Sequence, residues 1–172
     1  MITTRVYIVF YSGRPMDFQK LSDLSGVEPT SIEVKGEERI SRVTGKIVKV
    51  QAKNGEWIPR INEYNAFEYH LPASHGQYVN RQYNKLMRAI QNPGQLGEYC
   101  KSHGIKVYIQ VVACGITDTY SFPVLHIDKK FVTFLNDLNA EIDFDINSEP
   151  WQKDEDYYKP IDLPSGQVVT KI

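Results

Sequence analysis

The stretch Leu24-Ser25-Gly26-Val27-Glu28-Pro29-Thr30 marks a passage from a helix into a strand. Apolar residues recur at three-residue steps before it, which predicts a short helix over residues 15–24. Gly26 suits the left-handed backbone position that follows a helix. Pro29 biases the residue before it toward extended backbone, and the alternating apolar residues that follow predict a half-buried strand over 30–34.

The rest of the chain also alternates between the strand period and the helix period. Further strands are predicted at 6–11, 40–43, 46–52, 56–61, 105–114, 120–127 and 140–146, and further helices at 77–90, 95–102 and 129–138. Residues 65–71 are either one more strand or an irregular segment, and strand 120–127 is the expected antiparallel partner of 105–114. The pattern predicts a single α+β domain over 1–149, with a mixed, mainly antiparallel sheet of about six or seven strands and about three helices packed on it.

Turn and cap residues punctuate this pattern. Asn54-Gly55 is a strong two-residue hairpin signal, and Asp128 is the predicted N-cap of the last helix. Gly94, Gly97 and Gly104 are interpreted as helix stops and not as a phosphate cradle. The chain contains no GxxxxGK[ST], GxGxxG, GxSxG or HExxH pattern, so nucleotide-driven chemistry is disfavoured and no cofactor is predicted.

The composition is that of an ordinary globular chain of 172 residues, with 41% hydrophobic and 24% charged residues. Twenty basic and 21 acidic residues give a net charge of −1, so no electrostatic footprint of nucleic acid or an anionic membrane is visible. The N-terminus lacks a secretory pattern, and Cys100 and Cys114 are expected to be free thiols, which together predict a cytoplasmic protein. Periodicity is lost after Pro150, which predicts a tail over 150–172 that packs on or wraps the domain.

Four features occur in a specific order along the chain: the Leu24–Thr30 motif, Lys35-Gly36, a lone Trp57, and a final helix and strand over 131–146. In this order the chain resembles the bacterial domain-of-unknown-function family 4279 over about residues 5–147, with the tail from Pro150 outside the resemblance. The resemblance implies a small cytosolic α+β protein with an antiparallel sheet and no established reaction. It brings no catalytic residues, and some families of this size act as immunity proteins.

Cysteine and histidine residues suggest two kinds of site, a zinc site and a thiol nucleophile. Each pattern also has a purely structural explanation. Cys100 and His103 have the spacing of half a zinc site, but no second short-spaced pair follows, so His103 is interpreted as a helix-end residue and no metal is predicted. A thiol nucleophile would pair Cys100 or Cys114 with a histidine, and Cys114 ends its strand at an expected exposed position. The candidate histidines are His70, His75 and His126. Nothing in the sequence supplies an oriented base or an oxyanion hole.

Charged residues form two clusters in the sequence. Asp143 and Asp145 share one face of a predicted strand at a separation that suits an acid–base pair, yet alternate positions facing water are usually polar. Lys46, Lys49 and Lys53 make the central strands locally basic, but interleaved aromatic residues are almost absent there. Because single-stranded nucleic acid is usually stacked on aromatic side chains, nucleic-acid binding is disfavoured.

Aromatic residues are densest between Trp57 and the second helix. Aromatic anchors rimmed by polar groups are typical of protein interfaces and of small-ligand pockets. The predicted ligand- or partner-binding residues are Trp57, Tyr64, Glu68, Tyr69 and His70. The leading hypothesis is a non-enzymatic binding or regulatory protein, immunity-like in that it occludes a protein partner, with no membrane association. The alternative is a small-ligand-binding or enzyme domain with its site in Trp57–His70. The sequence leaves both a monomer and a homodimer open.

Overall fold

The computed structural model describes residues 2–41, 45–76, 78–114 and 125–146. The chain divides into two compact units, a larger one that contains residues 2–32 and 65–146 and a smaller one that contains Glu33–Tyr64. The predicted tail lies outside the described residues, and the predicted domain boundaries at 149 and 150 stay a prediction.

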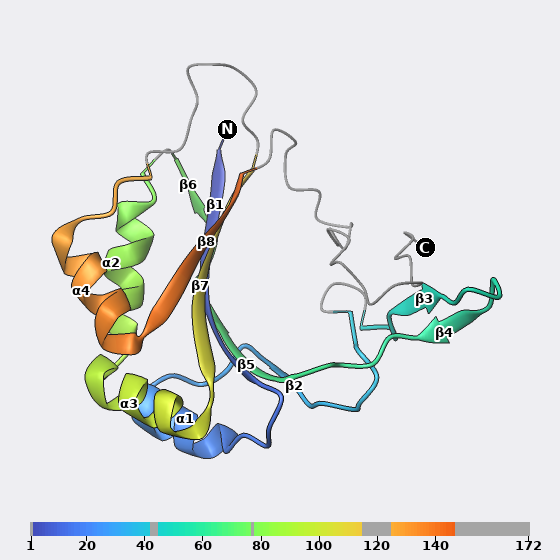
Figure 1. The fold of residues 1–172 in the computed structure, drawn as a ribbon. Coiled ribbons are helices and arrows are strands. Elements are labelled where there is room, and N and C mark those ends of the chain that lie inside the picture. Colours follow the sequence, from blue (N-terminus) through green and yellow to red (C-terminus); the bar gives the residue numbers. More distant parts are fainter. Residues whose placement is uncertain (1, 42–44, 77, 115–124, 147–172) are drawn as a thin grey trace. The chain divides into compact units, whose positions relative to one another are not determined.

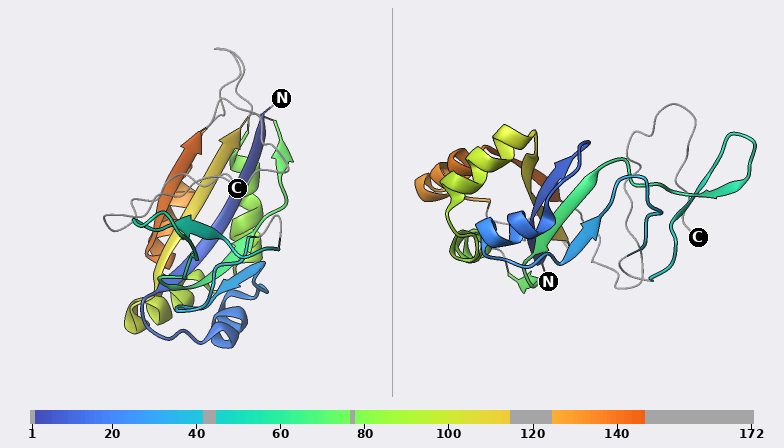
Figure 2. Two further views of the ribbon diagram at one scale, coloured as in Figure 1. Left: turned by 90° about the vertical axis from the view of Figure 1, so that its right-hand side faces the viewer. Right: turned by 90° about the horizontal axis from the view of Figure 1, so that it is seen from below.

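A six-stranded sheet organises the larger unit (Figures 1 and 2). Its path runs β2 (Ser31–Glu33), β5 (Asn65–His70), β1 (Thr3–Ser12), β7 (Lys106–Cys114) and β8 (Ala140–Ile146), while β6 (Ser74–His75) pairs with one end of β1. β1 is antiparallel to both β5 and β7, whereas β8 is parallel to β7. This confirms the predicted α+β fold with a mixed, mainly antiparallel sheet, and it places all but the last residue of the segment 65–71 in the sheet.

The predicted partner of β7 differs from the observed ones. Residues 120–124 lie outside the described residues, and 125–127 are not in a strand. The neighbours of β7 are instead β1 and β8. A parallel neighbour needs a crossover, and α4 (Lys129–Leu138) supplies a helix between β7 and β8. The pairing of distant strands leaves little trace in a local apolar pattern.

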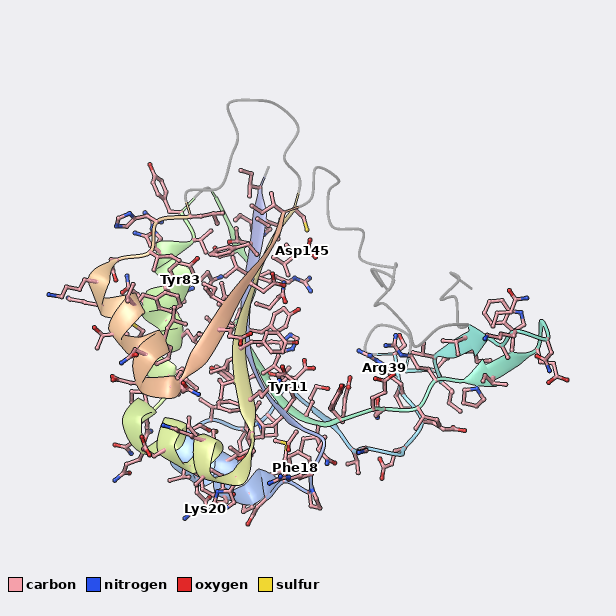
Figure 3. The ribbon with its side chains drawn as sticks, in the orientation of Figure 1. Tyr11, Phe18, Lys20, Arg39, Tyr83 and Asp145 are labelled. Atoms are coloured by element: carbon pink, nitrogen blue, oxygen red, sulfur yellow. The ribbon has the colours of Figure 1, made fainter. Side chains whose placement is uncertain are left out.

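All four described helices lie on one side of the sheet, as Figures 1 and 2 show. They are α1 (Phe18–Ser25), α2 (Asn80–Ala89), α3 (Pro93–His103) and α4, and each overlaps one of the helices predicted from the sequence. Figure 3 shows Tyr83 of α2 between the helices and the sheet. Its ring stacks on Phe131 of α4 with centroids 4.1 Å apart, and both side chains are buried. The apolar core therefore lies between the sheet and the helices.

Caps and close approaches fix where these helices lie. Asp128 accepts a 2.8 Å hydrogen bond from the Phe131 N–H, which confirms it as the N-cap of α4. Gly26 ends α1 at φ 72°, as predicted. The interpretation of Gly97 as a helix stop is wrong, because it lies inside α3, where a Cβ would overlap the Asp137 carbonyl oxygen. Gly94 is also inside α3, at its first turn, so Gly104 alone of the three ends this helix.

The smaller unit contains a two-stranded sheet of β3 (Lys49–Gln51) and β4 (Trp57–Pro59). The predicted hairpin turn is in place, but its geometry differs. The Gly55 N–H donates to the Ala52 carbonyl and the Ala52 N–H donates to the Glu56 carbonyl, which makes a three-residue loop with Gly55 at φ 84°. The sequence predicts a two-residue turn because Asn also tolerates positive φ. In the structure Gly55 alone of the pair has positive φ, and the Asn54 side chain accepts a hydrogen bond from the Glu56 N–H.

Candidate functional site

The side of the sheet opposite the helices carries polar, charged and aromatic side chains. Along β1, Val6, Ile8 and Phe10 are fully buried in the core, so the residues between them face the other way. The strand register extends this face across the sheet, because directly paired residues share a face. We call it the helix-free face, and it comprises Thr3, Arg5, Tyr7, Val9 and Tyr11 of β1, Ala66, Glu68 and His70 of β5, Lys106, Tyr108, Gln110, Val112 and Cys114 of β7, and Glu141, Asp143 and Asp145 of β8.

Three side chains form a compact cluster at the β1–β5 pair. His70 lies opposite Tyr7, and their rings stack with centroids 4.5 Å apart and planes 12° from parallel. The His70 Nε2 lies 2.8 Å from the Glu68 Oε2. The Glu68 side chain is 8% exposed and the His70 side chain 25% exposed. The cluster therefore presents one edge of an imidazole, with the carboxylate that orients it below the surface.

Backbone contacts hold β5 in the position that this cluster needs. The Thr30 N–H donates to the Glu68 carbonyl at 2.7 Å, and the Thr30 Oγ1 accepts from the His70 N–H at 3.0 Å. Both bonds come from the residue just before β2, the neighbour of β5 in the sheet. β5 is thus fixed between β1 on one side and the entry to β2 on the other.

Aromatic and acidic side chains continue the helix-free face across β7 and β8. Tyr11 contacts Tyr108 edge to face, with ring centroids 5.6 Å apart. Glu141 and Asp143 of β8 are exposed, whereas Asp145 is half-buried. Figure 3 shows Tyr11 and Asp145 on the side of the sheet away from the helices. Four carboxylates against the two cations Arg5 and Lys106 leave this part of the face, from β5 to β8, acidic.

The five predicted site residues do not share one place in the structure. Glu68 and His70 meet on the helix-free face, but Tyr69 points to the opposite face of β5 and packs against the core. Trp57 and Tyr64 belong to the smaller unit and are 41% and 50% exposed. Tyr7, the ring that stacks on His70, was absent from the prediction. In the sequence, Tyr7 is marked only by its position within the first strand. That strand looks like a continuous run of buried residues until its pairing with β5 is known.

The thiols are poorly placed for nucleophilic chemistry. Cys100 is buried, and burial raises its pKa to about 12, so the reactive thiolate is scarce near neutral pH. The expectation that Cys114 occupies an exposed position is wrong, because this residue is 5% exposed within β7. Both cysteines are free, as predicted. At this end of β7, Cys114 lies directly opposite Thr3 of β1.

His103 and His75 have local contacts. His103 lies in the last turn of α3, as predicted, with its Nδ1 2.8 Å from the Tyr99 carbonyl oxygen and 3.0 Å from the Ser102 hydroxyl. His75 has its Nδ1 3.3 Å from the Thr3 hydroxyl. Within the described residues, no group of three or more His, Cys, Asp or Glu side chains is arranged to hold a metal ion.

Comparison with known proteins gives one match. The family model for the domain of unknown function DUF4279 matches residues 2–149. No curated protein matches, and no solved structure matches. In the described part of the chain, none of the helices has the length and apolar character needed to cross a membrane.

Proposed function

Because the chain belongs to the DUF4279 family of domains of unknown function, its own residues have to indicate what it does, and we propose that it is a non-enzymatic binding protein that uses the helix-free face to hold a basic segment of a partner protein. The observation that carries the proposal is the joint presence on this face of tyrosine rings and carboxylates. Aromatic rings beside carboxylates are a combination that suits a guanidinium or ammonium group.

The geometry supports a binding role more than a catalytic one. Glu141 and Asp143 are exposed on the last described strand of the sheet, where a partner can approach them. Tyr11 and Tyr108 are half-buried beside them and held by an edge-to-face contact. Rigid aromatic side chains lose little conformational entropy when they bind, which makes them favourable interface anchors.

A charge-reversal pair tests this proposal against a matched control. The variant E141K/D143K changes two exposed carboxylates on the helix-free face, and E98K/D137K makes the same charge change on exposed helix positions. Each chain is immobilised and exposed to a native lysate. We expect the wild type and the control to retain the same proteins, and E141K/D143K to lose at least one of them. Once purified, that protein should bind more weakly as salt is raised. Identical sets of retained proteins for all three chains would reject the proposal.

An immunity-like role is the specific form of this proposal. It predicts that the protein lost by E141K/D143K is a toxin or nuclease and that the wild-type chain suppresses its activity when the two are mixed. A gene for such an enzyme beside the gene of this chain would identify the candidate to mix. A retained partner whose activity is unchanged by this chain would leave binding intact as a function and exclude the immunity-like form.

The contact between Glu68 and His70 favours a second candidate, a small-ligand or enzyme site. A buried carboxylate that orients an imidazole is an arrangement used in acid–base chemistry. Under this candidate, a compound from a metabolite library should raise the melting temperature of the wild type and of a H75Q control, but not of H70Q. A library in which no compound distinguishes H70Q from H75Q would count against it.

A further inference from the structure

The smaller unit buries very little apolar surface of its own. Among its described residues, Val50 is the single large apolar side chain that is buried, at 1% exposure. Its large exposed apolar side chains are Ile40 (52%), Ile47 (43%), Trp57 (41%), Ile61 (46%) and Tyr64 (50%). Small hairpins with so little buried surface are at best marginally stable in water. This unit therefore needs further apolar contacts to be stable.

The backbone of the unit is nevertheless closed by specific hydrogen bonds. The Arg39 N–H donates to the Arg60 carbonyl at 2.7 Å, the Arg60 N–H to the Val48 carbonyl at 2.8 Å, and the Val48 N–H to the Arg39 carbonyl at 2.8 Å. Ile40 and Ile47 lie directly opposite each other next to this ring of bonds. The exposed isoleucines are therefore held in place by an ordered backbone. This is what we expect of an apolar surface on which another segment packs.

We propose that the chain's own C-terminal segment, residues 150–172, packs on the apolar surface of the smaller unit. The proposal concerns a different surface from the helix-free face and is independent of the proposed function. Twenty-six residues, 147–172, follow the end of β8 at Ile146, and a chain of that length reaches at most roughly 85 Å when extended. The segment has the chemistry that can cover an apolar surface, because it carries apolar and aromatic residues between prolines. These are Trp151, Tyr157, Tyr158, Ile161, Leu163, Val168, Val169 and Ile172.

The charges of the two segments are complementary. Residues 33–64 contain seven Lys and Arg against five Glu, a formal charge of +2, whereas residues 150–172 contain four Asp and Glu against three Lys, a formal charge of −1. The basic residues include Lys46, Lys49 and Lys53 around β3, and the acidic residues include the run Asp154-Glu155-Asp156. Opposite charges at the edge of an apolar contact guide its register more than they strengthen it.

Tethering decides between this occupant and a separate molecule. A segment of the same chain is present at an effective concentration in the millimolar range when its linker spans the distance. A second copy or a foreign partner at micromolar concentration must bind about a thousand times more tightly to displace it. Three prolines, Pro150, Pro160 and Pro164, disfavour a regular helix or central strand, so we expect the segment to bind in extended form.

The two tryptophans of the chain, Trp57 and Trp151, provide the test. In W151F, Trp57 is the sole tryptophan, and its emission and quenching by acrylamide report whether it is covered. We expect Trp57 in W151F to be protected at every protein concentration, and the further variant W151F/Y157S/Y158S/I161S/L163S to show a red-shifted emission and a higher quenching constant. Equal quenching in the two variants, or protection that grows with protein concentration, would overturn the proposal.

Zero-length cross-linking of the unmodified chain gives a second readout that needs no substitution. Carbodiimide joins a lysine amine to a carboxylate in direct contact, so we expect peptides that link Lys46, Lys49 or Lys53 to the run 154–156 in the monomer band. Cross-links from that run solely to residues of the larger unit would overturn the proposal. So would links of these lysines to the run found in the dimer band alone.

Discussion

Replacing Gly97 with alanine tests whether close backbone contact between α3 and α4 sets the helix layer. A Cβ on Gly97 would overlap the Asp137 carbonyl oxygen and lie 3.0 Å from both the carbonyl carbon and the Cα of Leu138. The obstacle is backbone, so no side-chain rotation relieves it, and the two helices must move apart. Leu96 and Leu138, which are both fully buried here, would lose part of their packing.

The expected cost follows from two opposing effects. Overpacking of a well-packed region costs about 1–3 kcal/mol, and the rigid obstacle places this case toward the upper end. Alanine is the better helix former by about 1 kcal/mol, which offsets part of that cost. The net loss in the free energy of unfolding should be about 2 kcal/mol, which for a urea slope of about 2 kcal/mol per molar lowers the unfolding midpoint by about 1 M.

Gly94 provides the matched control within the same helix. A Cβ at Gly94 meets nothing within 4 Å, so G94A should be neutral or stabilising by about 0.5 kcal/mol. Urea unfolding followed by far-UV circular dichroism measures both variants against the wild type. If G97A were as stable as G94A, the close approach of α3 to α4 would be refuted, and with it the packing that aligns the helix layer on the sheet.

Three further predictions concern single side chains of the larger unit. Tyr83 Oη is buried without a hydrogen-bond partner among the described residues, so Y83F should be neutral or stabilising by about 1 kcal/mol in urea unfolding near pH 7. Burial raises the pKa of Tyr83 to about 12 from the model-peptide 10.0, so the unfolded chain ionises first and stability falls as pH rises from 10 to 12; Y83F should flatten that fall. Iodoacetamide near pH 7 should label neither Cys100 nor Cys114 in the native chain but both in urea, whereas rapid native labelling would contradict their burial. D128A should cost about 1 kcal/mol through loss of the cap bond to the Phe131 N–H, and an unchanged unfolding midpoint would argue against that bond.

The local sequence pattern predicts the parts of the fold that depend on interactions between residues close together in the chain. The predicted bounds of α4 and β8, 129–138 and 140–146, agree with the structure. A cap residue marks the start of α4, and an unbroken periodicity runs through both elements. Gly97 was misread because a glycine that allows two helices to touch looks in sequence like one that ends a helix. The parallel pairing of β7 with β8 was missed because strand order depends on contacts between residues far apart in the chain.

The candidate site was predictable to the extent that its residues lie on one strand. Glu68 and His70 are two residues apart on β5, so their shared face follows from the strand period. The same strand period places the side chain of Tyr69, which lies between them, on the other face of the sheet. The prediction groups all three residues because they are close together in the sequence. Tyr7 joins the cluster through a register between strands some sixty residues apart, which no local window contains.

The opening motif bears on function through structure alone. The Ser25 carbonyl accepts from the Gln91 N–H at 2.7 Å, which ties the end of α1 to the residues just after α2, and Thr30 bonds to the backbone of both Glu68 and His70. The segment Leu24–Thr30 thus connects the helix layer to β5, the strand that presents the imidazole. None of its residues contributes a side chain to the helix-free face, yet the position of that imidazole depends on it. A motif that carries the resemblance to the family can therefore be entirely structural and still determine how the helix-free face is formed.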